Sequence, residues 1–171
     1  MDMAAGIESA LEALRSIGAE FVFLCHPEAD TMEKCMGIGL GYGARHCKNL
    51  FLKNKRGTDF RLLLMDPDKP YRTSEVSRAL GVTRMSFGTE EELFNVLGLK
   101  QGSVSVMALA NPCAREAIGN GSLHVVVDSS LLEWERICVH PYTSLATLVV
   151  KTADLVRFIE STGVDLAVIP V

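Results

Sequence analysis

The sequence predicts an α+β fold, in which helices and strands alternate without a regular βαβ repeat. Two observations predict it. Some segments carry apolar residues at helical spacing, whereas others are short apolar runs bounded by Gly, Pro or Asn, as strands are. The chain has 171 residues, 48% of them hydrophobic, and no internal repeat, low-complexity tract or linker. We therefore expect one domain over residues 1–171, burying about 70% of the surface of the unfolded chain.

The first elements are a helix and a strand. Residues 5–17 have apolar positions at helical spacing, and Gly18 follows as a helix stop. Phe21–Cys25 is a short apolar run that ends at His26-Pro27, which predicts a strand. Thr31 then predicts a short helix that it would cap, with Lys34 on the exposed face.

The glycine-rich segment 37–43 predicts a flexible connection. It does not have the Gly-Lys-Ser/Thr ending of a phosphate-binding Walker loop. It is also no dinucleotide fingerprint, because no strand leads directly into it and no clear helix follows.

The centre of the chain predicts a hairpin followed by two helices. Residues 49–65 form two apolar strands that turn at 54–57, and the prolines of 66–70 end the second strand. We expect helices over Thr73–Leu80 and from Thr89 to Leu97, because Gly81 and Gly98 are stop signals. Thr89 with Glu92 three residues later also forms a capping box.

The last third predicts more strands and one helix. Residues 104–109 are expected to be extended, 123–127 to form a strand, and 139–150 to contain another. Thr152 is expected to cap a helix over 153–161, and 164–169 to form the closing strand.

Composition excludes several classes of function. No apolar run approaches the roughly 20 residues of a membrane span, and the N-terminal residues predict no signal peptide. The five cysteines contain no Cys-x-x-Cys pair, which argues against a disulfide framework and a standard zinc site. We expect a reduced, cytoplasmic protein whose cysteines are small core residues. Cys47 is the one cysteine that could be reactive, because the neighbouring Lys48 favours its thiolate form. Alternation along a strand would, however, place the two side chains on opposite faces.

A basic strip interrupts an acidic chain. Residues 45–72 contain eight Lys and Arg against three acids, a local balance of +5, while the whole chain carries −4. Such a strip suggests a local anionic partner.

Lys48-Asn49 is the first candidate site. The lysine could offer three donors to a phosphate or carbonyl group while the amide fixes its orientation. Alternatively, Lys48 is an edge lysine that keeps a strand soluble. The sequence pattern alone favours this second interpretation.

Three further places could carry chemistry. Amide N–H groups of Gly102-Ser103-Val104-Ser105 could stabilise an oxyanion, or the segment is an ordinary turn. His140, followed closely by Ser144, could form a polar pocket wall, or be a hydrogen-bonded histidine at a strand entrance. His26 could be a residue of the same site, or it only marks the end of a strand. No Ser/His/Asp order is present, so a hydrolase would depend on positioning and electrostatics.

These residues belong to a longer series of motifs, in the order printed here: His26-Pro27 with Thr31-Met32-Glu33-Lys34, residues 43–52, residues 68–73, residues 80–87, Leu97-Gly98-Leu99 with Gly102-Ser103-Val104-Ser105, Val139-His140-Pro141 and Thr152-Ala153-Asp154-Leu155. The whole series resembles the prolyl-tRNA-synthetase-associated editing family, over nearly the full chain.

The resemblance implies a fold and an activity. The fold would be a mixed, mostly antiparallel, partly barrel-like sheet with surrounding helices. The activity would be deacylation in trans of mischarged tRNA, chiefly alanine on the proline tRNA, as translational proofreading. Water would attack the ester, assisted by the ribose 2′-hydroxyl, without a metal or cofactor. The partners would be the acceptor end of the tRNA and prolyl-tRNA synthetase, with no DNA and no membrane.

The family's functional residues fall on positions of this chain. The resemblance assigns catalysis to Lys48 and Asn49. It assigns substrate binding to the following residues: His26, Gly102, Ser103, Ser105, His140 and Ser144.

The chain also departs from the family pattern. Val106 stands where a proline is usual, Ala108 where a glycine is usual, Asn111-Pro112 in place of Asn-Asp, and Ser144-Leu145 in place of Asn-Thr. Loss of proline and glycine would alter a pocket wall. Three interpretations follow: a changed amino-acid specificity, a weakened enzyme, or a non-catalytic module that binds tRNA or the synthetase.

Overall fold

The computed structural model describes Met1–Val171 and contains two separate sheets. One has four strands in the order β1-β8-β7-β2 and the other has five in the order β5-β3-β4-β6-β9. The strands are β1 (Phe21–Cys25), β2 (Ala44–His46), β3 (Lys48–Lys53), β4 (Phe60–Met65), β5 (Ser86–Phe87), β6 (Leu123–Asp128), β7 (Arg136–Val139), β8 (Ala146–Lys151) and β9 (Asp165–Ile169).

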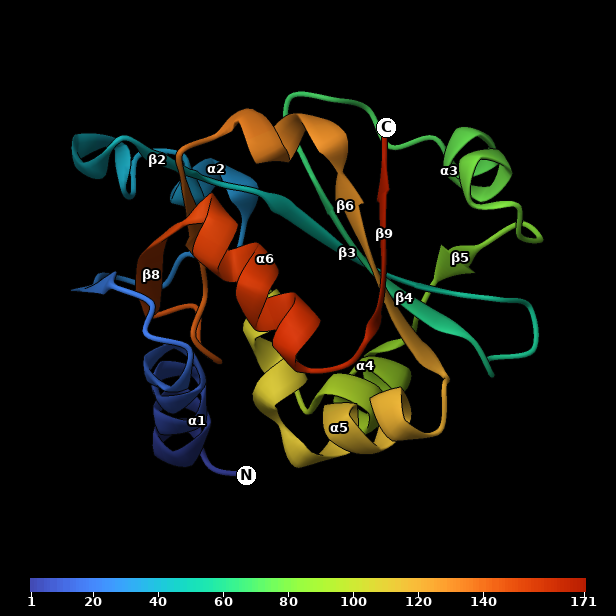
Figure 1. Cartoon of the computed structure of the whole chain (residues 1–171), viewed down its shortest axis with the longest axis horizontal. Coiled ribbons are helices and arrows are strands. Elements are labelled where there is room, and N and C mark those ends of the chain that lie inside the picture. Colours follow the sequence, from blue (N-terminus) through green and yellow to red (C-terminus); the bar gives the residue numbers. More distant parts are fainter.

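Helices surround the two sheets (Figure 1). The α-helices are α1 (Met3–Ser16), α2 (Met32–Cys35), α3 (Thr73–Leu80), α4 (Glu90–Leu97), α5 (Pro112–Gly119) and α6 (Thr152–Ser161). Three short 3₁₀ segments are η1 (Leu40–Tyr42), η2 (Val106–Ala110) and η3 (Ser129–Glu133). The helix α6 contacts both β8 and β9 and so connects the two sheets. None of the helices combines the length and the apolar character that crossing a membrane requires.

The two sheets are joined where β2 passes into β3. Figure 1 shows these strands as one extended ribbon across the molecule. The strand β2 pairs in parallel with β7, whereas β3 pairs antiparallel with β4, Lys48 lying opposite Met65. Cys47 is the single residue between the two strands. His46 is therefore the last residue of β2 in the four-stranded sheet, and Lys48 is the first residue of β3 in the five-stranded sheet.

The five-stranded sheet is covered on both faces. Leu62 and Leu64 of β4 belong to the main core cluster, while Leu63 and Met65 belong to a second cluster that includes Val76 of α3. All six residues of β4 are buried. This double burial explains why residues 62–65 of the strand are a continuous apolar run and not an alternating one.

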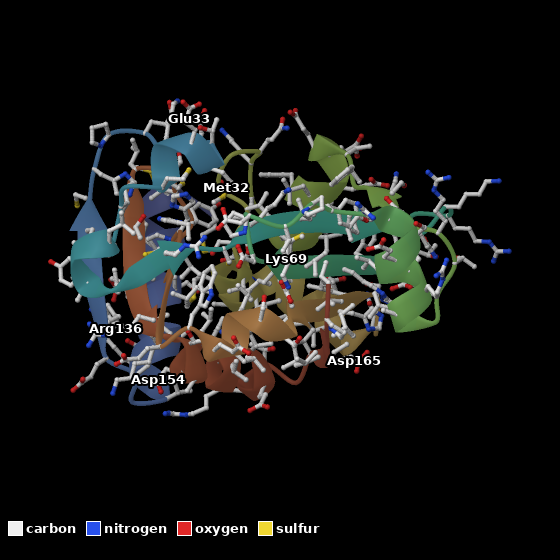
Figure 2. All side chains as sticks on the ribbon, turned by 90° about the horizontal axis from the view of Figure 1, so that it is seen from above. Met32, Glu33, Lys69, Arg136, Asp154 and Asp165 are labelled. Carbon is white, nitrogen blue, oxygen red and sulfur yellow. The ribbon has the colours of Figure 1, made fainter.

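A buried ion pair closes the end of β6. Asp128 is fully buried and accepts hydrogen bonds from Lys69 Nζ at 2.9 and 3.0 Å. Burial works to raise the pKa of Asp128, but hydrogen bonds from Lys69, Ser130 and Asp66 outweigh it and hold the pKa below its usual value. Lys69 lies toward the middle of the view in Figure 2.

Much of the predicted architecture is confirmed. The α+β class is correct, with antiparallel pairing in four of the seven strand pairs. The hairpin, the capping box at Thr89 and the glycine stops after α3 and α4 are present. The sheets do not close into a barrel, because each ends in two unpaired edge strands.

Two expectations about elements were wrong. Residues 106–110 form the buried turn η2 and not an extended strand, and α5 follows it, starting at Pro112 in the first helical turn, where proline is tolerated. Thr152 does not cap α6: it is the first helical residue, and its buried hydroxyl has no partner. The segment 139–150 contains the expected strand, β8, and also the last residue of β7. The segment 37–43 is a connection that contains the short turn η1.

Candidate functional site

A cavity of about 430 Å³ opens at the junction of the two sheets, a size typical of small-molecule sites. Its walls come from α2 and the residues before it, the β2–β3 ribbon, the entry to α4, the loop before η2, and the residue after β7. Figure 2 shows Met32 of α2 on the inner side of the helix and Glu33 at the outer edge. The lining residues used below are Asp30, Cys35, His46, Cys47, Lys48, Asn49, Glu90, Gly102, Val104 and His140.

Lys48 is the only lysine or arginine that lines this cavity. It is half-buried at the start of β3, and its ammonium group makes no salt bridge, whereas Lys53 on the same strand pairs with Glu92 at 2.7 Å. A cation held in a concave site without a carboxylate partner is available for an anionic or carbonyl-bearing ligand.

Asn49 supplies a second unsatisfied group beside Lys48. Its Nδ2 donates to the carbonyl oxygen of Cys47 at 3.3 Å, which fixes the direction of the amide. Its Oδ1 is buried and has no hydrogen-bond partner. Buried acceptors are nearly always satisfied in native structures, so this unpartnered oxygen is an exception within a residue that lines the cavity.

The Gly102 loop brings free backbone donors to the cavity. The amide N–H groups of Gly102 and Val104 donate to no group of the chain. Gly102 has φ +86°, and a Cβ at this position would lie 2.9 Å from Cβ of Asp30. Glycine is therefore required both by the backbone conformation and by the close approach to Asp30.

A buried group of histidine and cysteine side chains forms the inner wall. Cys35, His46 and His140 each place a ligand atom within 4.8 Å of the others. Burial lowers the pKa of His46 to about 3, helped by the neighbouring His140 and His26, and burial also lowers the pKa of His140. Burial raises the pKa of the Cys35 thiol. All three groups are therefore neutral at pH 7.

Cys47 is not the reactive thiolate that its neighbour Lys48 suggested. The side chain is 2% exposed, and burial raises its pKa to about 12. Desolvation thus outweighs the hydrogen bond with Asn49, which acts to lower the pKa. Cys47 nevertheless lines the cavity beside Lys48. It is the single residue between β2 and β3, so the alternation of side chains along one strand does not apply to it.

The structure brings some of the predicted site residues together and leaves others outside. Lys48, Asn49, Gly102 and His140 line the same cavity. The other four predicted residues do not line it: His26, Ser103, Ser105 and Ser144.

Each of those four residues has a local partner that explains its position. His26 Nε2 lies 2.8 Å from Thr147 Oγ1. Ser103 donates to the Lys100 carbonyl, and fully buried Ser105 accepts from the N–H of Met107 as the cap of η2. The Ser144 carbonyl accepts from the N–H of Ala29, which itself lines the cavity.

The departures from the family pattern also lie outside the cavity. Val106 and Ala108 are buried in the main core on η2, and Leu145 is 45% exposed. None of the three lines the cavity. The expectation that they form the wall opposite Lys48 is therefore wrong.

Most of the basic strip is neutralised by nearby carboxylates. Five of its eight cations make salt bridges within the chain: Arg45, Lys53, Arg61, Lys69 and Arg72. Lys48, Lys55 and Arg56 make none, and the last two are exposed at the hairpin turn. The strip is thus no continuous cationic surface, and the cation that matters for the cavity is Lys48.

Sequence reasoning missed two groups of cavity residues. His46 could have been found, because it precedes Lys48 by two residues on the same ribbon. Cys35 and the segment 87–90 at the entry to α4 carry no such signal, since only the tertiary fold brings them to β3.

Comparisons with known proteins identify the family. The profile of the aminoacyl-tRNA editing domain matches residues 26–158. A prolyl-tRNA synthetase associated domain-containing protein 1 from Danio rerio is 33% identical over 153 residues, which cover 88% of this chain and 79% of the relative. The prolyl-tRNA editing protein ProX of Acetoanaerobium sticklandii is 27% identical over 163 residues, 95% of each chain.

Solved structures share the fold. A crystal structure described as that of a candidate trans-editing enzyme for prolyl tRNA synthetase superimposes with a TM-score of 0.68 at 19% identity, over 100% of this chain and 98% of the other. The family profile covers most of the chain and includes every residue named here as lining the cavity. The chain therefore belongs to the aminoacyl-tRNA editing domain family.

Proposed function

We propose that the chain is a trans-acting aminoacyl-tRNA deacylase that acts as one domain over residues 1–171. It hydrolyses the ester of mischarged tRNA, with alanine on the proline tRNA as its substrate, during cytoplasmic proofreading. The observation that carries the proposal is the unpaired Lys48 ammonium group in a ligand-sized cavity. The family membership supports the reaction class, and the name of ProX supports the choice of tRNA.

The free groups of the cavity match the parts of an aminoacyl-adenosine end. Lys48 holds the phosphate of the terminal nucleotide or the ester end. Asn49 lies beside Lys48 as the polar residue that helps to orient the substrate, and the Glu90 carboxylate, which makes no salt bridge, lies in the same lining to attract the ammonium group. The N–H groups of Gly102 and Val104 stabilise the oxyanion of the tetrahedral intermediate.

Water is the nucleophile in this mechanism. Its oxygen bonds to the ester carbonyl carbon, the carbon–oxygen bond to the ribose breaks, and a water proton ends on the departing ribose oxygen. Cys47 does not compete, because its thiol stays protonated with a pKa of about 12. His46 is too weak a base to remove a proton at pH 7, with a pKa of about 3. Catalysis therefore depends on positioning and charge, with the substrate 2′-hydroxyl assisting proton transfer.

The non-catalytic alternative loses its motivating observation. It depended on Val106 and Ala108 as an altered pocket wall, and both lie in the core away from the cavity. We therefore keep deacylation as the single proposed function, with prolyl-tRNA synthetase as a partner and neither DNA nor membrane.

Deacylation of proline tRNA carrying alanine, with the protein in catalytic amount, tests the proposal. We expect Lys48→Ala to lower kcat/KM by about 10- to 150-fold, because a charge-assisted hydrogen bond contributes about 1.5–3 kcal/mol. Lys55→Ala is the matched control, since Lys55 is also unpaired but lies at the hairpin turn outside the cavity. Release of alanine no faster than the spontaneous rate, or equal loss in both variants, would refute the proposal.

A further inference from the structure

Cys35, His46 and His140 form a compact set of metal-binding side chains in the cavity wall. Each offers one ligand atom, these atoms lie within 4.8 Å of one another, and all three residues are buried. They come from α2, the end of β2 and the residue after β7. The standard spacing rules for zinc sites therefore miss this set, because its members lie far apart in the sequence.

The distances fit a tetrahedral ion. Sulfur and nitrogen ligands at the usual zinc distances, about 2.3 and 2.05 Å, are about 3.6 Å apart at a tetrahedral angle. Cys35 Sγ and His140 Nε2 are 3.6 Å apart. The ring centroids of His46 and His140 lie 5.1 Å apart, which is about the separation of two imidazoles on one tetrahedral ion.

Neighbouring groups already orient the histidines. His140 Nδ1 lies 2.8 Å from the carbonyl oxygen of Ala146, so Nδ1 carries the proton and Nε2 presents its lone pair toward Cys35. This is the arrangement by which a backbone carbonyl fixes a metal-ligating imidazole. The Nε2 atom of His46 contacts Thr147 Oγ1 at 3.2 Å, which holds the second ring.

The surroundings suit a catalytic type of site more than a closed structural one. All three residues also line the cavity, so a cavity water can serve as the fourth ligand. The charged residues of the lining are Asp30 and Glu90 against Lys48. Asp30 pairs with Lys34 at 2.6 Å, so Glu90 and Lys48 remain and their formal charges balance. The lining therefore carries no net positive charge that would oppose a cation.

We propose that Cys35, His46 and His140 bind one divalent transition-metal ion of the zinc class, with a cavity water as the fourth ligand. Two imidazoles and a thiolate are ligands that select such ions over magnesium and calcium. Binding displaces the Cys35 proton to solvent, since the thiolate is the ligand. The proposal concerns binding and holds whether or not the chain deacylates tRNA.

Cobalt(II) is the probe that tests it. The chelator-treated full chain is titrated with Co²⁺ and followed by absorption, and metal content after Zn²⁺ loading and gel filtration is measured by elemental analysis. We expect one ion per chain, a sulfur-to-cobalt charge-transfer band, and visible bands of tetrahedral intensity that Zn²⁺ abolishes. Octahedral spectra, or no binding up to millimolar Co²⁺, would overturn the proposal.

Variants separate the site from adventitious binding. Cys35→Ser should remove the charge-transfer band and weaken binding at least 10-fold, and His140→Gln should weaken it similarly. Cys25→Ser and Cys138→Ala are controls at an exposed and a buried cysteine outside the set, and both should bind as the parent does. A band that persists in Cys35→Ser refutes the assignment.

A stability readout keeps the test decisive if one variant folds poorly. A ligand that binds only the folded state raises the unfolding midpoint. Zn²⁺ should therefore raise the Tm of the parent, Cys25→Ser and Cys138→Ala, but not that of His46→Gln or His140→Gln. Equal shifts in all variants would overturn the proposal. These measurements need no tRNA, so their outcome is independent of the deacylation assay.

Discussion

Replacement of Gly102 by alanine is expected to disturb stability and the cavity together, because the new methyl group meets Asp30. Gly102 has φ +86°, and the added Cβ would lie 2.9 Å from Cβ of Asp30 and 3.4 Å from its carbonyl oxygen. The first distance is well inside van der Waals contact. The loop before η2, the segment before α2, or both must therefore shift, and both line the cavity.

The magnitude follows from two separate contributions. An L-residue in the left-handed region costs about 1–2 kcal/mol relative to glycine. Overpacking against Asp30 adds about 1–3 kcal/mol. We therefore expect Gly102→Ala to lower the free energy of unfolding by about 2–5 kcal/mol, and to reduce deacylation beyond the loss of folded protein because the N–H groups of Gly102 and Val104 move.

Gly81→Ala is the matched control for the backbone contribution alone. Gly81 has φ +66° at the end of α3, nothing lies within 4 Å of its added Cβ, and it does not line the cavity. Urea unfolding should show a loss of about 1–2 kcal/mol for this variant, with unchanged kcat/KM. If Gly102→Ala is no less stable than Gly81→Ala and deacylates normally, the close approach to Asp30 has no role and the reasoning is refuted.

Two further predictions concern Asn49 and Lys69. Asn49→Leu removes a buried, unpartnered acceptor but also the hydrogen bond from Nδ2 to the Cys47 carbonyl, so we expect stability in urea to change by no more than about 1 kcal/mol while kcat/KM falls at least about 10-fold. A normal kcat/KM would contradict a role of Asn49 in substrate binding. Lys69→Met leaves the fully buried Asp128 carboxylate without its cationic partner, and should lower the free energy of unfolding at pH 7 by about 3–5 kcal/mol. The folded-state pKa of Asp128 lies below its ordinary value of 3.8. The ion pair therefore stabilises the fold fully above pH 3.8, and this stabilisation is lost as the pH falls through the folded-state pKa. Urea unfolding between pH 7 and pH 2 should therefore show a steeper acid loss in the parent than in Lys69→Met, and parallel pH profiles would disprove the pairing.

Local patterns predicted the elements whose signals are contained in a few neighbouring residues. The capping box at Thr89 with Glu92 and the glycine stop at Gly81 were predicted correctly, because they satisfy backbone groups within one helical turn. The extended segment predicted over residues 104–109 was wrong, since an apolar run does not distinguish a buried 3₁₀ turn from a strand. Pairing partners, such as β2 parallel to β7, were not predictable, because they join residues about 90 positions apart.

The sequence by itself determined the family, the class of fold and the candidate Lys48-Asn49, because these depend on the order and identity of residues along the chain. Only the tertiary structure decided which polar groups share a cavity. It brings Cys35 and His140 to within 3.6 Å although they are 105 residues apart, and it places Val106 and Ala108 in the core instead of opposite Lys48. It also decides charge state, since burial raises the pKa of the Cys47 thiol to about 12 and keeps it protonated. Burial and long-range contact belong to the folded chain, and no local pattern encodes them.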